Sequence, residues 1–339
     1  MNKFYVQWHI VDRCNLRCRH CYQDDYSPAD ELPISELIKI ASRLLETLKK
    51  WKLRLTVALT GGEPLLKQEL PELIDFLNSS SGVSDISIIT NGLLIPGWLK
   101  ELTRKKKFRE MKVSLDGASA ATNDWVRGQG TYEKILSGIR KMKEIGLPVT
   151  IMFTAMKKNQ HEVPELIELA KSLQADGLII ERFFPLGQGQ RMKEEVLSGE
   201  EFLHLWQTLI SLFDLQADPE DLVPFRAIKV EFRKKKPLIF GASCVVGKDG
   251  MALMPDGTVF PCRRFIQPIG NLREQSLEEI WEKNPWLQEI RNKLYLKGRC
   301  GVCSHPTCFG CRAMTLALTG DPFEADPHCY YEDFKFTVS

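Results

Sequence analysis

Short apolar segments alternate with amphipathic segments six times between residues 4 and 213. The apolar segments have the length of buried strands, whereas the segments between them place apolar residues three and four positions apart, as in helices. Six strand–helix units in succession predict parallel strands joined by right-handed crossovers, either as an open sheet or as a curved partial barrel. The expected strands are 4–11, 53–60, 84–90, 110–116, 148–155 and 176–183, and the expected helices are 34–48, 69–78, 97–105, 131–145, 162–173 and 200–213.

The overall composition is that of a globular protein. The chain has 339 residues, 43% of them hydrophobic, which is enough for one large domain and a smaller one. The formal net charge of +2 gives no general attraction to nucleic acid or to a membrane surface, and the basic runs 104–107 and 233–236 are expected to be solvated. There is no secretory apolar core and no long apolar window, so a cytoplasmic location is expected.

The ten cysteines are unevenly distributed. Three precede residue 22, none lies between 22 and 243, and seven lie from 244 to 329. Because the cytoplasm is reducing, clustered cysteines there indicate metal or iron-sulfur ligation rather than disulfides. The distribution predicts a catalytic portion, residues 1–220, and a metal-binding portion, residues 221–339. The six histidines are isolated and are expected to have packing or surface roles.

Polar signatures follow the first four expected strands. In architectures of parallel strands, ligand-binding loops follow the carboxyl ends of the strands, so these signatures should meet at one rim. The Gly/Pro-rich segment 183–190, after the sixth strand, should lie near the same site. The signatures are Cys14, Cys18 and Cys21 after the first strand, 60–64 (TGGEP) after the second, 90–92 (TNG) after the third and 114–117 (SLDG) after the fourth.

The spacing Cys-x3-Cys-x2-Cys at Cys14, Cys18 and Cys21, followed by the aromatic Tyr22, resembles that of the radical S-adenosylmethionine (SAM) enzymes. The resemblance covers most of residues 4–215 and implies an α/β fold, a partial (β/α)6 barrel. It also implies that three thiolates hold a 4Fe-4S cluster whose fourth iron is left free to chelate SAM. Reductive cleavage of SAM would then yield a 5'-deoxyadenosyl radical that abstracts hydrogen from a substrate.

The resemblance implies SAM contacts from four loops. The glycine-rich turn would receive the methionine amino group, the backbone after the third cysteine would contact adenine, and the loop after the fourth strand would reach the ribose and the carboxylate. The residues implied are Gly61, Gly62, Glu63 and Pro64 for the amino group, Tyr22 for adenine, Ser114, Asp116 and Arg127 for the ribose and the carboxylate, and Asn91 as a further candidate.

The C-terminal cysteines are similar to those of the SPASM extension of this family, over roughly residues 237–335. That extension is a small cysteine-rich domain that houses one or two auxiliary iron-sulfur clusters. Two gaps, on either side of Cys308, are one residue shorter than in relatives, so the allocation of Cys308 and Cys311 stays open. Two clusters need eight ligands and the region has seven cysteines, so the eighth ligand stays open as well. The resemblance implies Cys244, Cys262 and Cys311 for a first auxiliary cluster, and Cys300, Cys303, Cys308 and Cys329 for a second.

A structural zinc site is the alternative interpretation of part of this region. Cys300, Cys303, Cys308 and Cys311 could supply four ligands to one zinc ion. A separate alternative for the whole chain is a non-enzymatic iron-sulfur electron carrier or a zinc-binding interaction module. The turn at residues 61–64 argues against a carrier, because a carrier does not need to bind methionine.

Members with this extension mostly modify peptides or proteins, so the resemblance implies oxidation or crosslinking of a peptide substrate, with a reductant such as flavodoxin or ferredoxin. The first expected strand starts within the first ten residues, so either a separate protein would present a leader peptide or the substrate would bind without one. The alternative is modification of a tetrapyrrole side chain or another small metabolite. Arg263 and Arg264, which follow Cys262, could meet a carboxylate of either substrate.

Overall fold

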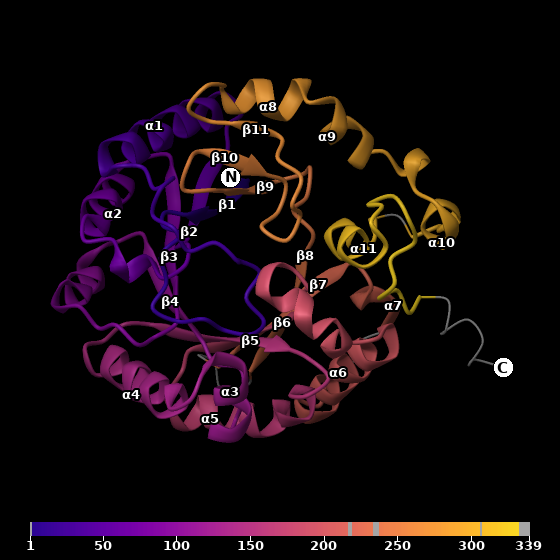
Figure 1. Cartoon of the computed structure of the whole chain (residues 1–339), viewed down its shortest axis with the longest axis horizontal. Helices are drawn as coiled ribbons and strands as arrows, with labels where there is room; N and C mark the ends of the chain where they lie inside the picture. The colour runs from indigo at the N-terminus through magenta and orange to yellow at the C-terminus, as the bar shows by residue number, and fades with distance from the viewer. Residues whose placement is uncertain (1, 216–218, 233–236, 306, 332–339) are drawn as a thin grey trace.

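The computed structural model describes residues 2–215, 219–232, 237–305 and 307–331; the basic run 233–236 lies outside them. Eleven strands of this part of the chain form one open sheet in the order β11-β10-β9-β1-β2-β3-β4-β5-β6-β7-β8. The sheet curves, and Figure 1 shows the helices arranged around its outer side. The architecture is the α/β fold expected from the alternating pattern.

All six expected strands are confirmed, and consecutive ones pair in parallel from β1 to β6. Their carboxyl ends therefore lie at one edge of the sheet, where ligand-binding loops are expected. The strands are β1 (Lys3–His9), β2 (Arg54–Thr60), β3 (Val83–Thr90), β4 (Phe108–Ser114), β5 (Val149–Ala155) and β6 (Gly177–Arg182).

The helices between the strands cover the outer face of the sheet. The segment expected as a helix at 97–105 is a 3-10 helix, η2, and a helix that periodicity did not predict, α3, follows β4. Their bounds are α1 (Ile34–Lys50), η1 (Pro64–Leu66), α2 (Leu70–Ser79), η2 (Gly97–Arg104), α3 (Ala120–Arg127), α4 (Thr131–Glu144), η3 (Gln160–Glu162), α5 (Val163–Ser172), η4 (Gly187–Glu195) and α6 (Gly199–Leu212).

Local sequence explains why these helices form where they do. In α1, Leu37, Ile40, Leu44 and Leu48 recur at helical spacing and are buried against the sheet. Pro33 precedes the first turn in an extended conformation, which suits a helix start. Burial of a side chain such as leucine contributes roughly 1.5–3 kcal/mol, so one apolar face is sufficient to fix α1 on the sheet.

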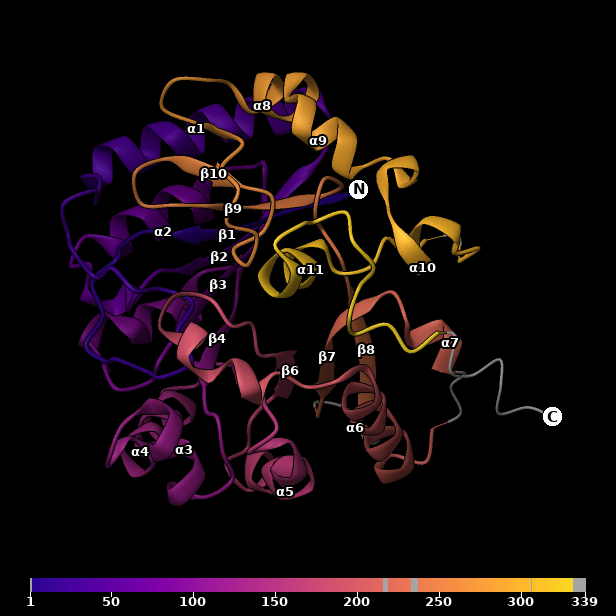
Figure 2. The same cartoon turned by 45° about the vertical axis from the view of Figure 1, so that its right-hand side comes forward.

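The C-terminal part extends the sheet at both of its edges. β7 pairs antiparallel with β6, whereas β9 pairs in parallel with β1. The helix α11 lies near β7 and β8 in both views (Figures 1 and 2). The bounds are α7 (Pro219–Leu222), β7 (Phe225–Glu231), β8 (Leu238–Ser243), β9 (Gly250–Leu253), β10 (Thr258–Phe260), β11 (Gly270–Asn271), α8 (Leu277–Lys283), α9 (Pro285–Ile290), η5 (Lys293–Tyr295), α10 (Gly298–Val302) and α11 (Arg312–Thr319).

The division of the chain into a catalytic portion, 1–220, and a metal-binding portion, 221–339, stays a prediction. One sheet contains strands of both portions. Among the described residues, no helix has the length and apolar character needed to cross a membrane.

Candidate active site

A cavity opens at the carboxyl ends of the parallel strands. It encloses about 1050 Å³, including the part of its mouth that is open to solvent, which is ample for a cofactor. Cys14, Cys18 and Cys21 lie in its wall, as expected. Each of the six parallel strands also contributes to the lining, through Gln7, Thr60, Thr90, Ser114, Thr154 and Glu181.

The glycine-rich turn after β2 packs directly on the backbone that leads into the cysteine loop. Gly62 N donates to Val11 O at 2.9 Å, and Glu63 N donates to Arg13 O at 2.8 Å. A Cβ at Gly61 would lie 2.1 Å from Val11 O, and one at Gly62 would lie 2.2 Å from Arg13 O. Neither position can carry a side chain without moving the loop, so both glycines position the cysteines as well as lining the cavity.

Two further contacts fix the cysteine loop from the opposite side. Gly189 N, from the segment after β6, donates to Cys21 O at 3.0 Å, and Arg19 N donates to Val126 O of α3 at 2.9 Å. A Cβ at Gly187, whose φ is +53°, would lie 2.5 Å from the carbonyl carbon of Tyr22. The Gly/Pro-rich segment 183–190 is therefore part of the site, as the sequence predicted.

The residues that the family resemblance implies for SAM divide into two groups. Gly61, Gly62, Tyr22, Asn91, Ser114 and Arg127 line the cavity, whereas Glu63, Pro64 and Asp116 are buried behind its wall. The Asn91 side chain donates to Asn15 Oδ1 at 2.7 Å, next to Cys14. The implied contacts of these residues with SAM stay a prediction.

Glu63 connects two of the loops that form the site. Its carboxylate accepts hydrogen bonds from Leu65 N at 3.1 Å, Thr90 Oγ1 at 2.8 Å and Asn91 N at 2.8 Å. Burial raises the pKa of Glu63 to about 7, although these three donors oppose the shift. Both carboxylate oxygens are thus used inside the protein, which gives Glu63 a structural role at the site.

Asp116, Arg127 and His20 form a buried electrostatic cluster beneath the cysteines. Asp116 Oδ2 lies 2.7 Å from Arg127 Nη2 and 3.0 Å from His20 Nε2. Burial would raise the pKa of Asp116, but Arg127 and His20 together hold it well below its usual value. The carboxylate therefore stays ionised and neutralises Arg127, whose Nη1 lies 4.0 Å from Cys18 Sγ.

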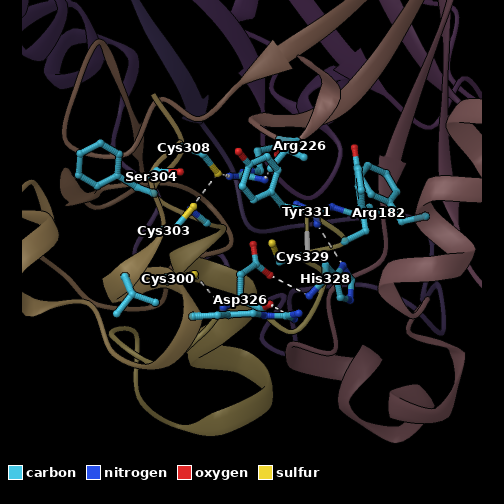
Figure 3. A pocket seen from close by; sticks show the side chains of 17 residues that line it. Arg182, Arg226, Cys300, Cys303, Ser304, Cys308, Asp326, His328, Cys329 and Tyr331 are labelled. Atoms are coloured by element: carbon cyan, nitrogen blue, oxygen red, sulfur yellow. Dashed lines mark hydrogen bonds between the residues drawn. The ribbon is translucent and has the colours of Figure 1, made fainter. Parts of the chain in front are cut away.

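The C-terminal cysteines occupy a second region. Figure 3 shows Cys300, Cys303, Cys308 and Cys329 around one cavity, with Asp326 and His328 beside them. The other three lie together: Cys311 is among the groups that raise the pKa of both Cys244 and Cys262, in each case after the larger effect of burial. The allocation of these seven cysteines to two auxiliary clusters stays a prediction.

Within the part of the chain that the structure describes, no three cysteine, histidine, aspartate or glutamate side chains converge closely enough to hold one metal ion. The four sulfurs of the second region surround a cavity instead. This arrangement suits a cluster, in which each thiolate binds a different iron, better than it suits a tetrahedral zinc site.

Comparison with known proteins identifies the family. A model described as the radical SAM superfamily matches residues 8–170, and one described as an iron-sulfur cluster-binding domain matches residues 244–311. The chain is 30% identical to a protein named AdoMet-dependent heme synthase from Methanosarcina barkeri (strain Fusaro / DSM 804), over 97% of each chain. The chain belongs to the radical SAM superfamily. It has a C-terminal SPASM domain, and its cofactors are SAM and 4Fe-4S clusters.

Two other similar proteins carry different names. The chain is 29% identical to a protein named Pre-heme d1 synthase from Dinoroseobacter shibae (strain DSM 16493 / NCIMB 14021 / DFL 12), over 96% of this chain and 85% of that protein. A crystal structure of Streptococcus suis SuiB bound to precursor peptide SuiA superposes with a TM-score of 0.73 at 16% identity, over 97% of this chain and 76% of that one. The latter likeness concerns the fold.

The described residues of this radical SAM protein fit its cofactors. Cys14, Cys18 and Cys21 are free thiols at the wall of a cavity with room for a second ligand group. Burial raises the pKa of the Cys18 thiol to about 12, so binding iron must displace a proton from it. The described residues of the cavity thus suit a cluster with one open iron.

Several residues of the cavity wall were not expected from the sequence. His20 and Arg182 line the cavity, and Arg264 reaches it from the C-terminal part, where it pairs with Glu181 at the end of β6. Only Arg264 had a signal in the sequence, through its place after Cys262. The contact of His20 Nε2 with Asp116 Oδ2, at 3.0 Å, had no signal in the sequence, because it depends on the tertiary fold.

Proposed function

We propose that the protein is a radical SAM enzyme that modifies a carboxylate-bearing side chain of a tetrapyrrole. The tetrapyrrole was the alternative that the sequence left open, and we now prefer it to a peptide substrate. It is supported by similarity over nearly the whole chain to proteins named AdoMet-dependent heme synthase and Pre-heme d1 synthase. The SuiB structure bound to a peptide is similar in fold only, at 16% identity.

The observation that carries the proposal is the basic and aromatic end of the cavity. Arg264 lies over the ring of Phe184, 5.0 Å from its centroid, and pairs with Glu181. Arg182 is 2% exposed, and its Nε and Nη2 have no hydrogen-bond partner among the described residues. A guanidinium group can bind a carboxylate through two hydrogen bonds, and an aromatic ring can pack against a flat macrocycle. A propionate side chain suits this wall.

The protein residues have separate tasks in this reaction. Cys14, Cys18 and Cys21 hold the cluster, and the glycine turn and Asn91 shape the space beside it. When bound there, SAM supplies a carbon radical able to remove a hydrogen atom. Phe183 and Phe184, buried at the end of β6, exclude water from the far side of the cavity.

The direct test is an anaerobic reaction of the reconstituted protein with SAM, a chemical reductant and iron coproporphyrin, which is rich in propionates. We expect 5'-deoxyadenosine to form together with a change in the mass of the tetrapyrrole. The proposal would be wrong if 5'-deoxyadenosine formed while the tetrapyrrole stayed unchanged and a peptide offered in its place changed in mass. The substrate would then be a peptide.

Two matched variants locate the carboxylate. Arg264→Gln should raise KM for the tetrapyrrole about ten- to a hundredfold, the loss expected for a charge-assisted hydrogen bond, while cleavage of SAM persists. Glu181→Gln removes the partner of Arg264 and should leave KM unchanged or lower it, because the guanidinium becomes free for the substrate. Equal KM values in all three proteins would place the carboxylate elsewhere.

A further inference from the structure

Four arginines lie around the C-terminal cavity formed by Cys300, Cys303, Cys308 and Cys329. Arg299, which lines it, donates to Asp326 O at 2.9 Å, and the other three are Arg182, Arg226 and Arg312. Arg182 and Arg312 are 2% and 1% exposed, and Arg226 is partly buried with its Nε inaccessible and without a hydrogen-bond partner. Arg182 and Arg226 line the cavity itself (Figure 3). Desolvation of an ionised group is costly unless an opposite charge compensates for it.

The described residues supply only part of that compensation. Asp326 is the one buried carboxylate of this region, and although burial raises its pKa, Arg226 and Arg182 hold it below its usual value. Among the described residues, none of Arg182, Arg226 and Arg312 has a carboxylate oxygen within 4.0 Å. The guanidinium groups bind neutral acceptors instead. Arg226 donates to Val223 O at 3.0 Å, Arg312 donates to Pro322 O at 2.8 Å, and Arg182 Nη1 lies 3.1 Å from His328 Nδ1.

Two of these arginines point donors at cysteine sulfurs. Arg226 Nη2 lies 3.3 Å from Cys308 Sγ, and Arg312 Nη2 lies 3.5 Å from Cys300 Sγ. Gly310, with φ +65°, makes room for one of them, since a Cβ there would lie 2.1 Å from Arg312 Nη2. The local backbone is thus built to bring a guanidinium group to a sulfur.

His328 adds a neutral donor to this group. Because arginine can only donate, its contact with Nδ1 places the imidazole proton on Nε2. That Nε2 is buried and has no hydrogen-bond partner in the described part of the chain, and His328 lines the cavity. The expectation of a packing or surface role for His328 therefore misses a polar group that faces the cluster site.

We propose that Arg226 and Arg312 raise the reduction potential of the auxiliary 4Fe-4S cluster held by Cys300, Cys303, Cys308 and Cys329, through their charge and their hydrogen bonds to its cysteine sulfurs. Reduction adds one electron and hence one negative charge to the cluster, and cations and hydrogen-bond donors at its sulfurs stabilise that charge. Such a cluster is suited to take one electron from a substrate radical and to return it to an exogenous one-electron carrier. The proposal concerns the cluster alone and does not depend on which substrate is modified.

The experiment measures the midpoint potential of this cluster by potentiometry followed by electron paramagnetic resonance. The full chain carries Cys14, Cys18, Cys21, Cys244 and Cys262 replaced by alanine, so that neither the N-terminal cluster nor the other auxiliary cluster contributes a signal. In this background we compare Arg226→Gln, Arg312→Gln and the charge-preserving Arg226→Lys. Arg104→Gln is the matched control, because Arg104 is an exposed arginine paired with Glu101 on η2.

We expect Arg226→Gln and Arg312→Gln to shift the midpoint to more negative values, Arg226→Lys to shift it less, and Arg104→Gln to leave it unchanged. Iron content should be the same in all four proteins. If one glutamine variant loses iron, the other carries the test. An unchanged midpoint in a glutamine variant that retains its iron would overturn the proposal, as would zinc in place of iron in the parent protein.

Discussion

Both cysteine regions of this protein present thiols to a cluster, three at the N-terminal site and four around the C-terminal cavity, but they surround these thiols with different charges. At the N-terminal site, Arg127, the buried arginine beside Cys18, lies 2.7 Å from the carboxylate of Asp116. At the C-terminal site, Arg182, Arg226 and Arg312 lie in a region with one buried carboxylate, Asp326. The guanidinium group beside the N-terminal thiols is thus neutralised, whereas the arginines of the C-terminal region outnumber its buried carboxylate.

This difference matters because thiolate ligation alone does not set the potential of a cluster. Net charge and hydrogen bonds to sulfur move it over a wide range. A cluster that must reduce a sulfonium needs a low potential, which a neutral site allows. A cluster that takes up an electron needs a higher potential, which the unpaired arginines supply.

The largest effect should come from separating the two regions by mutation. Replacing Cys14, Cys18 and Cys21 by alanine should abolish formation of 5'-deoxyadenosine, because no cluster remains to bind and reduce SAM. If two auxiliary clusters are present, iron should fall from roughly twelve to roughly eight atoms per chain. The measurements are iron and sulfide analysis and chromatography of the SAM products.

The matched change in the other region is Cys300→Ala, which should leave SAM cleavage measurable and stop turnover of the substrate. Retained 5'-deoxyadenosine in the triple variant would contradict the assignment of the N-terminal site. A fall from roughly four iron atoms to none, with zinc retained, would show that a structural metal occupies the C-terminal region.

A smaller effect should follow from making the N-terminal site resemble the C-terminal one. Asp116→Asn leaves Arg127 buried without its counter-charge, which should lower the free energy of unfolding by about 3–5 kcal/mol. It should also raise the potential of the N-terminal cluster and slow SAM cleavage. Anaerobic denaturant unfolding and potentiometry measure the two effects.

Arg127→Gln provides the internal check on that prediction, because it removes the charge that Asp116 neutralises. The double variant should lose less stability than the sum of the two single variants, since the unpaired charge is gone. Additive losses would mean that Asp116 acts through Thr154 N, from which it also accepts a hydrogen bond at 2.8 Å, rather than through Arg127.

The fold was largely predictable, because it depends on local pattern. Buried segments such as 53–60 and amphipathic ones such as 34–48 indicate strand and helix from their own residues. The parallel pairing of β9 with β1 was not predictable, because it joins segments more than two hundred residues apart. The segment 97–105 also misled, since its apolar spacing fits an α-helix but the chain forms a 3-10 helix there.

The site was predictable as a set of loops but less so as a set of side chains. The motifs identified the turns that meet at the cavity, yet they could not show that Glu63 and Asp116 point into the protein. Contacts such as Arg264 with Glu181 and Arg226 with Cys308 join residues 83 and 82 positions apart. Periodicity and spacing carry no information about such pairs.

The smallest effect concerns Glu63, which holds the N-terminal loops together without a charged partner. Its folded-state pKa of about 7 lies above the ordinary glutamate value of 4.5, so between these two pH values the folded protein keeps a proton that the unfolded chain has lost. Wild-type stability should therefore fall as pH rises through this window, by about 1 to 3 kcal/mol in total.

Glu63→Gln should make that decline smaller, because an amide does not ionise, whereas Asp12, whose pKa burial raises to about 6, still contributes to it. The variant also loses one acceptor for Thr90 or Asn91 at every pH. Denaturant unfolding at a series of pH values would measure both effects. If the variant keeps the wild-type slope, another group titrates in this window, and Glu63 stays charged through its three hydrogen bonds. The N-terminal site would then carry one more negative charge at neutral pH, and its contrast with the arginine-rich site would be larger than these contacts indicate.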